Sequence, residues 1–305
     1  MAAVDRVGII GLGIMGSAMS TNLIRAGFST FGYDVRAPRR SEFVKAGGRV
    51  SRSVSDLGAK VPIIITSLPS SAALLAVAAE LAQARHRGQI VVETSTLPIA
   101  TKEQGRKLLT ARGITLLDCP LSGTGAQARV RDLAVYASGL RSAYRICTPI
   151  FEGFARTHFF LGPFGAGSKM KFLANLLVAI HNVSAAEALV LGIKAGLDPA
   201  TMVKVLGDGA GSSRMLQLRG PMMVRNNYRH AAMKVGVWQK DMQIIADFAR
   251  QLNCPTPLFA ATSAIYNAAM AQGFAEADTA SVCAVLETWA KTNRRVATPP
   301  RSRRR

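Results

Sequence analysis

A lysine and an asparagine, Lys171 and Asn175, follow a glycine-rich segment halfway along the chain. Residues four apart lie on one face of a helix. An amine beside a carbinol oxygen can accept the hydroxyl proton when a hydride leaves the carbon, and its ammonium returns that proton in reverse. A surface lysine with a capping asparagine has the same spacing. The preceding glycines, Gly162, Gly165 and Gly167, favour the catalytic interpretation.

A second glycine-rich segment lies near the start, between an expected strand and a helix expected from Ser17 to Arg25. It consists of Gly11, Leu12, Gly13, Ile14, Met15 and Gly16. In this pattern the first glycine permits a tight turn, the second lets the backbone approach a pyrophosphate, and the third lets helix and strand pack closely. The helix N-terminus then faces the phosphates. The segment therefore predicts a dinucleotide site.

An aspartate, Asp34, ends the next expected strand, at about the 20-residue offset of an acid that binds a ribose 2′-hydroxyl. A carboxylate there repels a 2′-phosphate, so NAD is the first expectation. Arg36 lies two residues further on and can accommodate that phosphate, so NADP stays open.

Three later loops follow expected strands, where open α/β sheets bind ligands. They are Leu68-Pro69, Thr94-Ser95-Thr96 and the segment from Asp118 to Gly125. In the third, Ser122 and the Gly123 amide can hydrogen-bond a carboxylate without a bulky side chain in the way. Asp118 itself is expected to cap backbone amides. Loops that form ordinary turns without binding a ligand have the same residue types, so that alternative stays open.

The elements that must position these residues alternate in the first half of the chain. Short apolar runs separated by helix-like segments are typical of βαβ units in a mostly parallel sheet with helices on both faces. Strands are expected at Arg6–Ile10, Thr30–Tyr33, Ile63–Leu68, Ile90–Glu93, Ile114–Leu117, Ala134–Ala137 and Phe159–Leu161. The predicted class is α/β, beginning with a Rossmann-type doubly wound sheet.

Beyond Ser168 the strand pattern ends, and one long interdomain helix is expected over Lys169–Ala195. Its core-facing stripe is predicted at Leu173, Leu177, Ile180, Ser184 and Ala188. Asp198 and Pro199 fit the start of the next helix. Helices are expected over 199–206, 237–252, 257–272 and 277–291. We therefore expect a dinucleotide-binding domain at 1–165, an all-helical domain for substrate binding and oligomerisation at 166–291, and a tail at 292–305.

Length and composition agree with two domains. The chain has 305 residues, 49% of them hydrophobic, which is enough to bury two cores. Its longest apolar runs fall short of the roughly 20 residues of a membrane span, so no membrane partner is expected. Four scattered cysteines lack metal-ligand spacing, which indicates reduced thiols and no metal site. A cytoplasmic protein is expected.

A formal net charge of +20 raises the question of nucleic acid. Part of it lies in an arginine-rich stretch from Lys291 to Arg305 that also contains two prolines. That composition cannot pack a core, so a disordered, solvated tail is expected, with a polyanion-binding arm as the alternative. The remaining positive charge suits an anionic cofactor and acidic substrates.

Four motifs in order give the chain a resemblance to the β-hydroxyacid dehydrogenase family, which includes 3-hydroxyisobutyrate dehydrogenases and tartronate semialdehyde reductases. The resemblance extends from about Val7 to Lys291. The family's glycine motif, substrate motif, lysine–asparagine motif and late lysine–aspartate pair match Gly11–Gly16, Asp118–Thr124, Gly162–Asn175 and Lys240–Asp241.

The resemblance implies that Lys171 is the catalytic acid and base, and that Asn175, Ser122 and Gly123 contact the substrate. It implies that Lys240 approaches the nicotinamide end of the cofactor, whose path is lined by Leu68, Pro69 and Thr96. A small anionic 3-hydroxy acid, or its semialdehyde, is the implied substrate. A homodimer or homotetramer is the implied assembly.

Two departures from the family pattern bear on the substrate. Thr124 replaces the usual second glycine of the substrate motif, and Arg131 stands where a glycine commonly closes that segment. We expect the Thr124 side chain to add bulk and a hydroxyl to the anion cradle. An imine reductase is the nearest alternative, but those enzymes usually lack the lysine kept here. A non-catalytic cofactor-binding protein with a polyanion-binding tail is the other, and retention of Lys171 and Asn175 argues against it.

Overall fold

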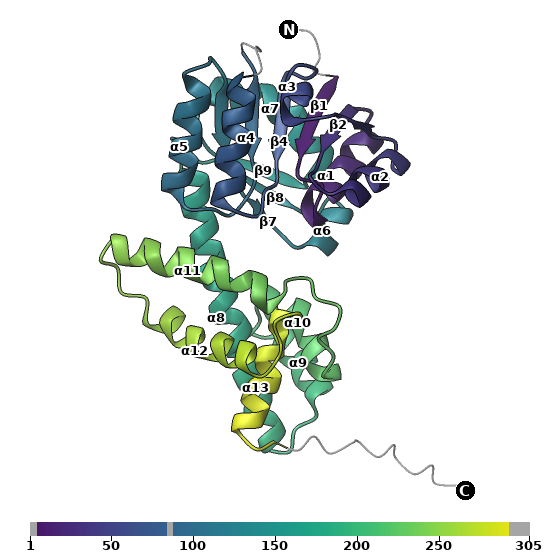
Figure 1. Cartoon of the computed structure of the whole chain (residues 1–305). Coiled ribbons are helices and arrows are strands. Elements are labelled where there is room, and N and C mark those ends of the chain that lie inside the picture. The colour runs from purple at the N-terminus through teal and green to yellow at the C-terminus, as the bar shows by residue number, and fades with distance from the viewer. Residues whose placement is uncertain (1–4, 84–87, 293–305) are drawn as a thin grey trace, which may run out of the picture. The chain divides into compact units, whose positions relative to one another are not determined.

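The computed structural model describes residues 5–83 and 88–292. The chain separates into two compact units, Met1–Ala174 and Asn175–Arg305 (Figure 1). The predicted basic tail lies outside the described residues from position 293 onward.

Six strands form the main sheet in the described part of the first unit, and every pairing in it is parallel. They are β1 (Arg6–Ile10), β2 (Ser29–Tyr33), β3 (Arg49–Val50), β4 (Ile63–Thr66), β5 (Ile90–Glu93) and β6 (Thr115–Asp118). Their spatial order is β3-β2-β1-β4-β5-β6. Strand order reverses between β1 and β4, and such a switch point is where open α/β sheets bind ligands. The predicted α/β class is confirmed.

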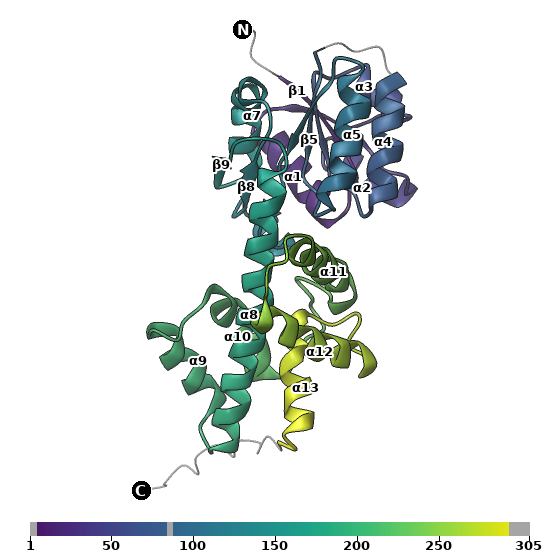
Figure 2. The same cartoon turned by 90° about the vertical axis from the view of Figure 1, so that its left-hand side faces the viewer.

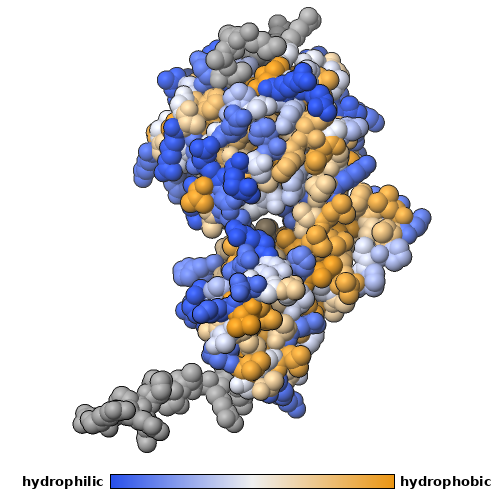
Figure 3. Space-filling view, turned by 180° about the vertical axis from the view of Figure 1, so that it is seen from behind, coloured by the Kyte–Doolittle hydropathy of each residue, from blue (hydrophilic) through white to orange (hydrophobic). Residues whose placement is uncertain are grey.

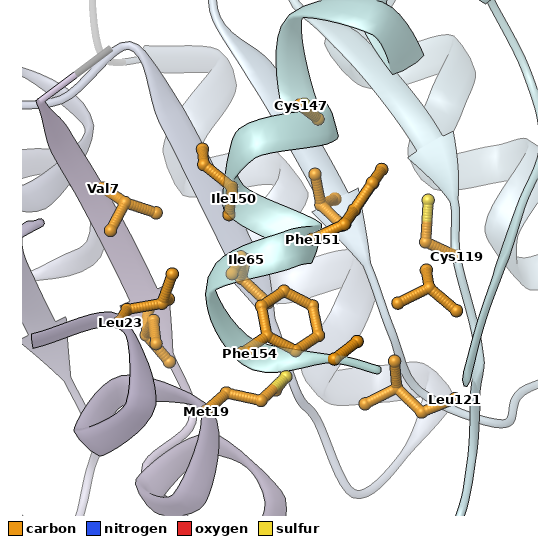
Figure 4. Packing of buried hydrophobic residues seen from close by; sticks show 14 of the residues in the cluster. Val7, Met19, Leu23, Ile65, Cys119, Leu121, Cys147, Ile150, Phe151 and Phe154 are labelled. Carbon is orange, nitrogen blue, oxygen red and sulfur yellow. The ribbon is translucent and has the colours of Figure 1, made fainter. Parts of the chain in front are cut away.

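Helices cover both faces of this sheet, which is why its central strands β4 and β5 are buried along their whole length (Figure 2). One face packs on α1 (Ile14–Arg25), α2 (Ala37–Lys45) and α7 (Arg141–Phe154), and the other on α3 (Val54–Gly58), α4 (Ser71–Gln83) and α5 (Ile99–Thr110). Ile9 points to the first face, in a cluster with Leu23 and Phe151 (Figure 4 shows part of this cluster). Its neighbour Ile10 points to the other face, with Leu57.

A smaller sheet of three strands lies beside the main one in the described part of this unit. Its strands are β7 (Leu121–Ser122), β8 (Ala134–Ala137) and β9 (Thr157–Phe160), and α6 (Gly125–Arg129) follows β7. The last two predicted strands therefore exist as β8 and β9, but they belong to this smaller sheet and not to the main one. The two-residue strands β3 and β7 were not predicted, because two residues are too few to show an alternating pattern.

In the second unit the described residues form helices joined by loops, with an isolated β-bridge between Lys234 and Asp278. The helix α8 (Ala166–Lys194) leads into it, followed by α9 (Pro199–Asp208), α10 (Arg214–Arg225), α11 (Val235–Gln251), α12 (Pro257–Ala271), a 3₁₀ turn (Thr279–Ser281) and α13 (Val282–Trp289). Asp198 caps α9 by accepting a hydrogen bond from the Thr201 amide at 2.8 Å, as its position before Pro199 suggested. We did not predict α10, because Gly220 and Pro221 inside it are helix breakers by type.

The predicted core-facing stripe of α8 is wrong. Leu173 and Leu177 are 53% and 49% exposed, whereas Phe172 and Ala179 on another face are buried. The helix is apolar all round, with a mean hydropathy of 1.8 over its most apolar window, so spacing alone could not choose the packed face. By length and composition α8 could cross a membrane, and 44% of that window is buried in the protein. Apolar patches also interrupt the polar surface of the helical unit in Figure 3.

Candidate active site

The first glycine-rich segment lies at the switch point of the main sheet. Gly11 follows β1 with a φ of +92°, and a side chain there would collide with the carbonyl of Ser67, which follows β4. Gly16 lies in α1 so close to the Gly11 carbonyl that any Cβ would overlap it. These contacts hold the turn tight and leave the N-terminus of α1 open toward a ligand.

A hollow of about 480 Å³ opens beside this turn. It is lined by residues of the turn and of α1, by one acidic residue, Glu42, and by three arginines: Leu12, Gly13, Ile14, Ser17, Ala18, Thr21, Arg25, Arg39, Glu42 and Arg129. Backbone amides at a helix N-terminus and arginine guanidinium groups are the donors that phosphates prefer. The residues present therefore fit the pyrophosphate of a dinucleotide.

Asp34 is buried at the end of β2 and ties down the glycine-rich turn. One carboxylate oxygen accepts the Leu12 amide at 2.8 Å, and the other accepts the Arg36 amide at 2.8 Å. Arg39 lies 3.4 Å from the first oxygen. This anchoring role was missed, because a sequence offset shows that an acid is present but not which amides its oxygens meet.

The loops after β4 and β5 are joined by a hydrogen bond. The Leu68 amide donates to Ser95 Oγ at 2.8 Å, and the Ser95 amide donates to Glu93 Oε1 at 2.9 Å. Pro69 is exposed and Thr96 is half-buried. The structure thus brings together the two loops that were singled out separately in the sequence.

The substrate motif spans β7 and the start of α6. Ser122 is half-buried in β7, and Gly123 follows with a φ of +130° that favours glycine. The Thr124 side chain caps α6 in a reciprocal capping box with Gln127, so its hydroxyl is engaged there and does not simply add a free group to the cradle. Arg131 has a φ of +61°, which explains why a glycine is usual at its position.

The substrate motif also touches the cofactor turn and the start of α8. A side chain at Gly125 would collide with Ile14. Gly167, in the first turn of α8, passes so close to the carbonyls of Tyr136 and Asp118 that only glycine fits. Lys171 lies one turn further along α8 and is half-buried. The first unit therefore brings the glycine-rich turn, the substrate motif and the start of α8 together, and Lys171 follows in the next turn of that helix.

In the helical unit, an aspartate holds the asparagine of the motif. Asn175 is 4% exposed, and its Nδ2 donates to Asp241 Oδ2 at 2.9 Å. Lys240 Nζ lies 3.1 Å from the other oxygen of the same carboxylate. From the sequence, Asp241 is only the neighbour of Lys240 in the late lysine–aspartate motif, and nothing there predicts its contact with Asn175. Its contact makes it a positioning residue for Asn175.

Thiol and metal chemistry find little support in the described residues. Among residues 5–83 and 88–292, no group of three or more His, Cys, Asp or Glu side chains is placed to hold a metal ion. Cys119 and Cys147 lie among apolar side chains (Figure 4). Burial raises the pKa of Cys147 to about 12 and raises the pKa of Cys119 well above its ordinary value, so both stay protonated and unreactive.

Sequence comparison identifies both parts of the chain. The profile of the NAD binding domain of 6-phosphogluconate dehydrogenase matches residues 6–162, and that of the NAD-binding domain of NADP-dependent 3-hydroxyisobutyrate dehydrogenase matches 165–286. An L-threonate dehydrogenase of Cupriavidus necator is 31% identical over 92% of this chain and 95% of its own length. A mitochondrial 3-hydroxyisobutyrate dehydrogenase of Rattus norvegicus is 29% identical over 92% and 87%.

Comparison of structures agrees. A Mycobacterium tuberculosis 3-hydroxyisobutyrate dehydrogenase solved with L-serine has a TM-score of 0.85 and 26% identity, over 93% of this chain and 99% of that one. An imine reductase from Pseudomonas sp. has a TM-score of 0.60 and 20% identity, which shows a shared fold alone. The resemblance seen in four motifs is confirmed. The chain belongs to the β-hydroxyacid dehydrogenase family and is an NAD(P)-dependent oxidoreductase acting on a CH–OH group.

Proposed function

We propose that the protein interconverts a small 3-hydroxy acid and its semialdehyde, with Lys171 as the general acid and base. The observation that carries this proposal is the place of Lys171, in the first turns of a helix whose start is fixed against the substrate motif by Gly167. An amine there is poised beside the loops that the dinucleotide and the acid would occupy.

Each of the site residues has a separate role in this proposal. Bound NAD(P) supplies the hydride acceptor. The turn from Leu12 to Gly16 binds its pyrophosphate, while Ser122 Oγ and the Gly123 amide hold the substrate carboxylate. Lys171 takes the proton of the C3 hydroxyl. Asn175 donates one N–H of its side-chain amide to Asp241, and its other N–H can donate to the C3 oxygen.

The nicotinamide end of the cofactor is assigned to four further residues. They are Leu68, Pro69, Thr96 and Lys240. The joined loops after β4 and β5 support the first three, because they lie at the carboxyl edge of the sheet, next to the glycine-rich turn. Lys240 rests on the family motif. Its ion pair with Asp241 lowers the cost of keeping that carboxylate beside Asn175.

We infer that NAD is the preferred cofactor, with Asp34 as the discriminating residue. In Asp34→Ala, we expect the affinity for both dinucleotides to fall roughly tenfold, because the turn loses a charged hydrogen-bond acceptor. In Asp34→Asn, the charge is removed and one of the two acceptors for the Leu12 and Arg36 amides is lost, so both affinities should fall somewhat and the Kd ratio of NADP to NAD should also fall. Fluorescence titration measures both. Asp5→Asn removes an exposed carboxylate before β1 and is the control. An unchanged Kd ratio in Asp34→Asn would show that the ribose site was misplaced.

We also propose a homodimer or homotetramer in the cytoplasm. The exposed apolar face of α8, with Leu173 and Leu177, supports self-association because isolated monomers rarely leave such a face uncovered. Sedimentation velocity gives the mass to compare with the 32.4 kDa of one chain. A single 32.4 kDa species at micromolar concentration would contradict the assembly.

The experiment that tests the proposed reaction is an initial-rate assay of NAD and of NADP reduction over a panel of 3-hydroxy acids. Serine, glycerate and 3-hydroxyisobutyrate vary the C2 substituent beside a primary C3 alcohol. Threonine and threonate also carry a carbon substituent at C3, so their oxidation there gives a ketone, and all five keep the C3 hydroxyl and the carboxylate. We expect turnover with at least one of them. Dinucleotide binding without turnover of any of the five would contradict the proposed substrate class.

A further inference from the structure

A lysine is completely buried beneath the loops of the site. Lys102, on α5, is 0% exposed, and its Nζ lies 2.5 Å from Glu93 Oε2 and 2.8 Å from Asp118 Oδ1. Both carboxylates are also 0% exposed. Burial alone lowers the pKa of Lys102, but Asp118 and Glu93 outweigh it, so the pKa is raised and the ammonium stays charged.

Each carboxylate extends to a different part of the site. Asp118 accepts the Ser168 amide at 2.8 Å and Ser168 Oγ at 2.7 Å, three residues before Lys171. On the other side, Glu93 accepts the Ser95 amide, and Ser95 Oγ accepts the Leu68 amide. One arm therefore reaches the start of the catalytic helix. The other reaches the loops assigned to the cofactor.

Burial of three charges has a large desolvation cost in the free energy of folding. Apolar side chains of similar volume often stabilise a core as well or better, so stability alone does not explain these residues. Ion pairs and hydrogen bonds are directional, so they fix the distance between two parts of a site more closely than apolar packing does. Misplacement of reacting groups by about 1 Å can cost on the order of 100-fold in rate.

We propose that Lys102 is a positioning residue that links the cofactor loops, through Glu93, to the start of the catalytic helix, through Asp118. This inference rests on the proposed role of Lys171. The bridge holds the lysine amine at a set distance from the bound nicotinamide. It touches neither substrate nor cofactor itself.

Two conservative variants test the arms separately. Ser168→Ala removes the side-chain bond to Asp118, and we expect kcat to fall about tenfold with the dinucleotide Kd unchanged. Ser95→Ala removes the acceptor of the Leu68 amide, and we expect the dinucleotide Kd to rise about fivefold. Ser20→Ala is the matched control, since Ser20 is equally buried in the same unit and its hydroxyl bonds only to the Ser17 carbonyl among the contacts described. It should change neither constant.

Lys102→Met should affect both constants, and adding Ser168→Ala to it should lower kcat further by less than twofold. Thermal destabilisation of Ser168→Ala and Ser95→Ala with wild-type kcat and dinucleotide Kd would overturn the proposal and leave a structural role alone.

A substrate-free readout separates this inference from the proposed reaction. In hydrogen exchange, Ser168→Ala should speed exchange in residues 166–172, Ser95→Ala in residues 66–70, and Lys102→Met in both segments. If the wild-type enzyme turned over none of the panel acids, the proposed reaction would fail while this pattern would still support the bridge. Exchange that rose uniformly across the unit in every variant would overturn the bridge itself.

Discussion

Replacing Lys171 with alanine is expected to lower turnover by at least about a hundredfold while the dinucleotide Kd stays near its wild-type value. The reason is that the C3 hydroxyl proton then has no base to accept it as the hydride leaves. In the proposed mechanism Lys171 does not hold the pyrophosphate, which is the task of the turn after β1. Steady-state kinetics with the best panel acid, together with fluorescence titration of the dinucleotide, measure both quantities.

A neighbouring lysine provides the control for that experiment. Lys169 is exposed two positions earlier in α8, so Lys169→Ala removes the same charge from the same helix without removing the proposed base. It should keep turnover within about twofold of wild type. Near-normal turnover in Lys171→Ala would remove the lysine from the chemistry and leave the family assignment standing without this mechanism.

Replacing Lys102 with methionine is expected to lower the free energy of unfolding by about 3–5 kcal/mol, because breaking a buried ion pair leaves uncompensated charge in the interior. Chemical denaturation at pH 7 measures the difference. The methionine is close in volume to the lysine, so the loss would reflect charge and not a cavity. A loss below about 1 kcal/mol would contradict the view that the ammonium compensates both buried carboxylates.

The pH dependence of that loss has a defined sign. The raised pKa of Lys102 means that its contribution in the wild-type protein is fully present below its ordinary value of 10.5 and is lost only as the pH rises beyond it. Lys102→Met lacks this contribution. The difference in stability between the wild type and the variant should therefore stay constant from about pH 7 to pH 10 and narrow only at higher pH. A difference that narrows below about pH 10 would contradict the argument.

Features set by local chemistry were predictable from the sequence. The glycine-rich turn, the strands around it and the Asp198 cap follow from residue types at short spacing, which act on neighbouring backbone. The packed face of α8 was not predictable, because the helix is apolar on every side and the partners that bury one face are distant in the chain. Pro221 misled for the opposite reason, since packing holds a helix there despite an unfavourable residue.

The supporting contacts of the site were the hardest part to predict. Lys102 and Asp118 are 16 residues apart, and Ser168 lies 50 residues from the same carboxylate. No periodicity or motif joins such residues, because the sheet brings them together. Asp34 illustrates the same limit at shorter range. The spacing predicted an acid that binds a ribose, and in the structure the two oxygens of Asp34 accept hydrogen bonds from the Leu12 and Arg36 backbone amides. One signal was available in the sequence. Lys102 lies on the same face of α5 as the buried residues Gly105 and Leu109, and a lysine on a buried face needs a charged partner.

The central claim, that a hydride leaves C3 of a hydroxy acid, is tested most directly with isotope. The panel acid with the highest turnover would be prepared with deuterium at C3 and incubated with the enzyme and oxidised cofactor, and the reduced nicotinamide analysed by mass spectrometry and proton NMR. We predict one deuterium at C4 of the nicotinamide, with none lost to water, and a primary isotope effect on the rate. Unlabelled reduced cofactor, or deuterium recovered in the solvent, would contradict the account.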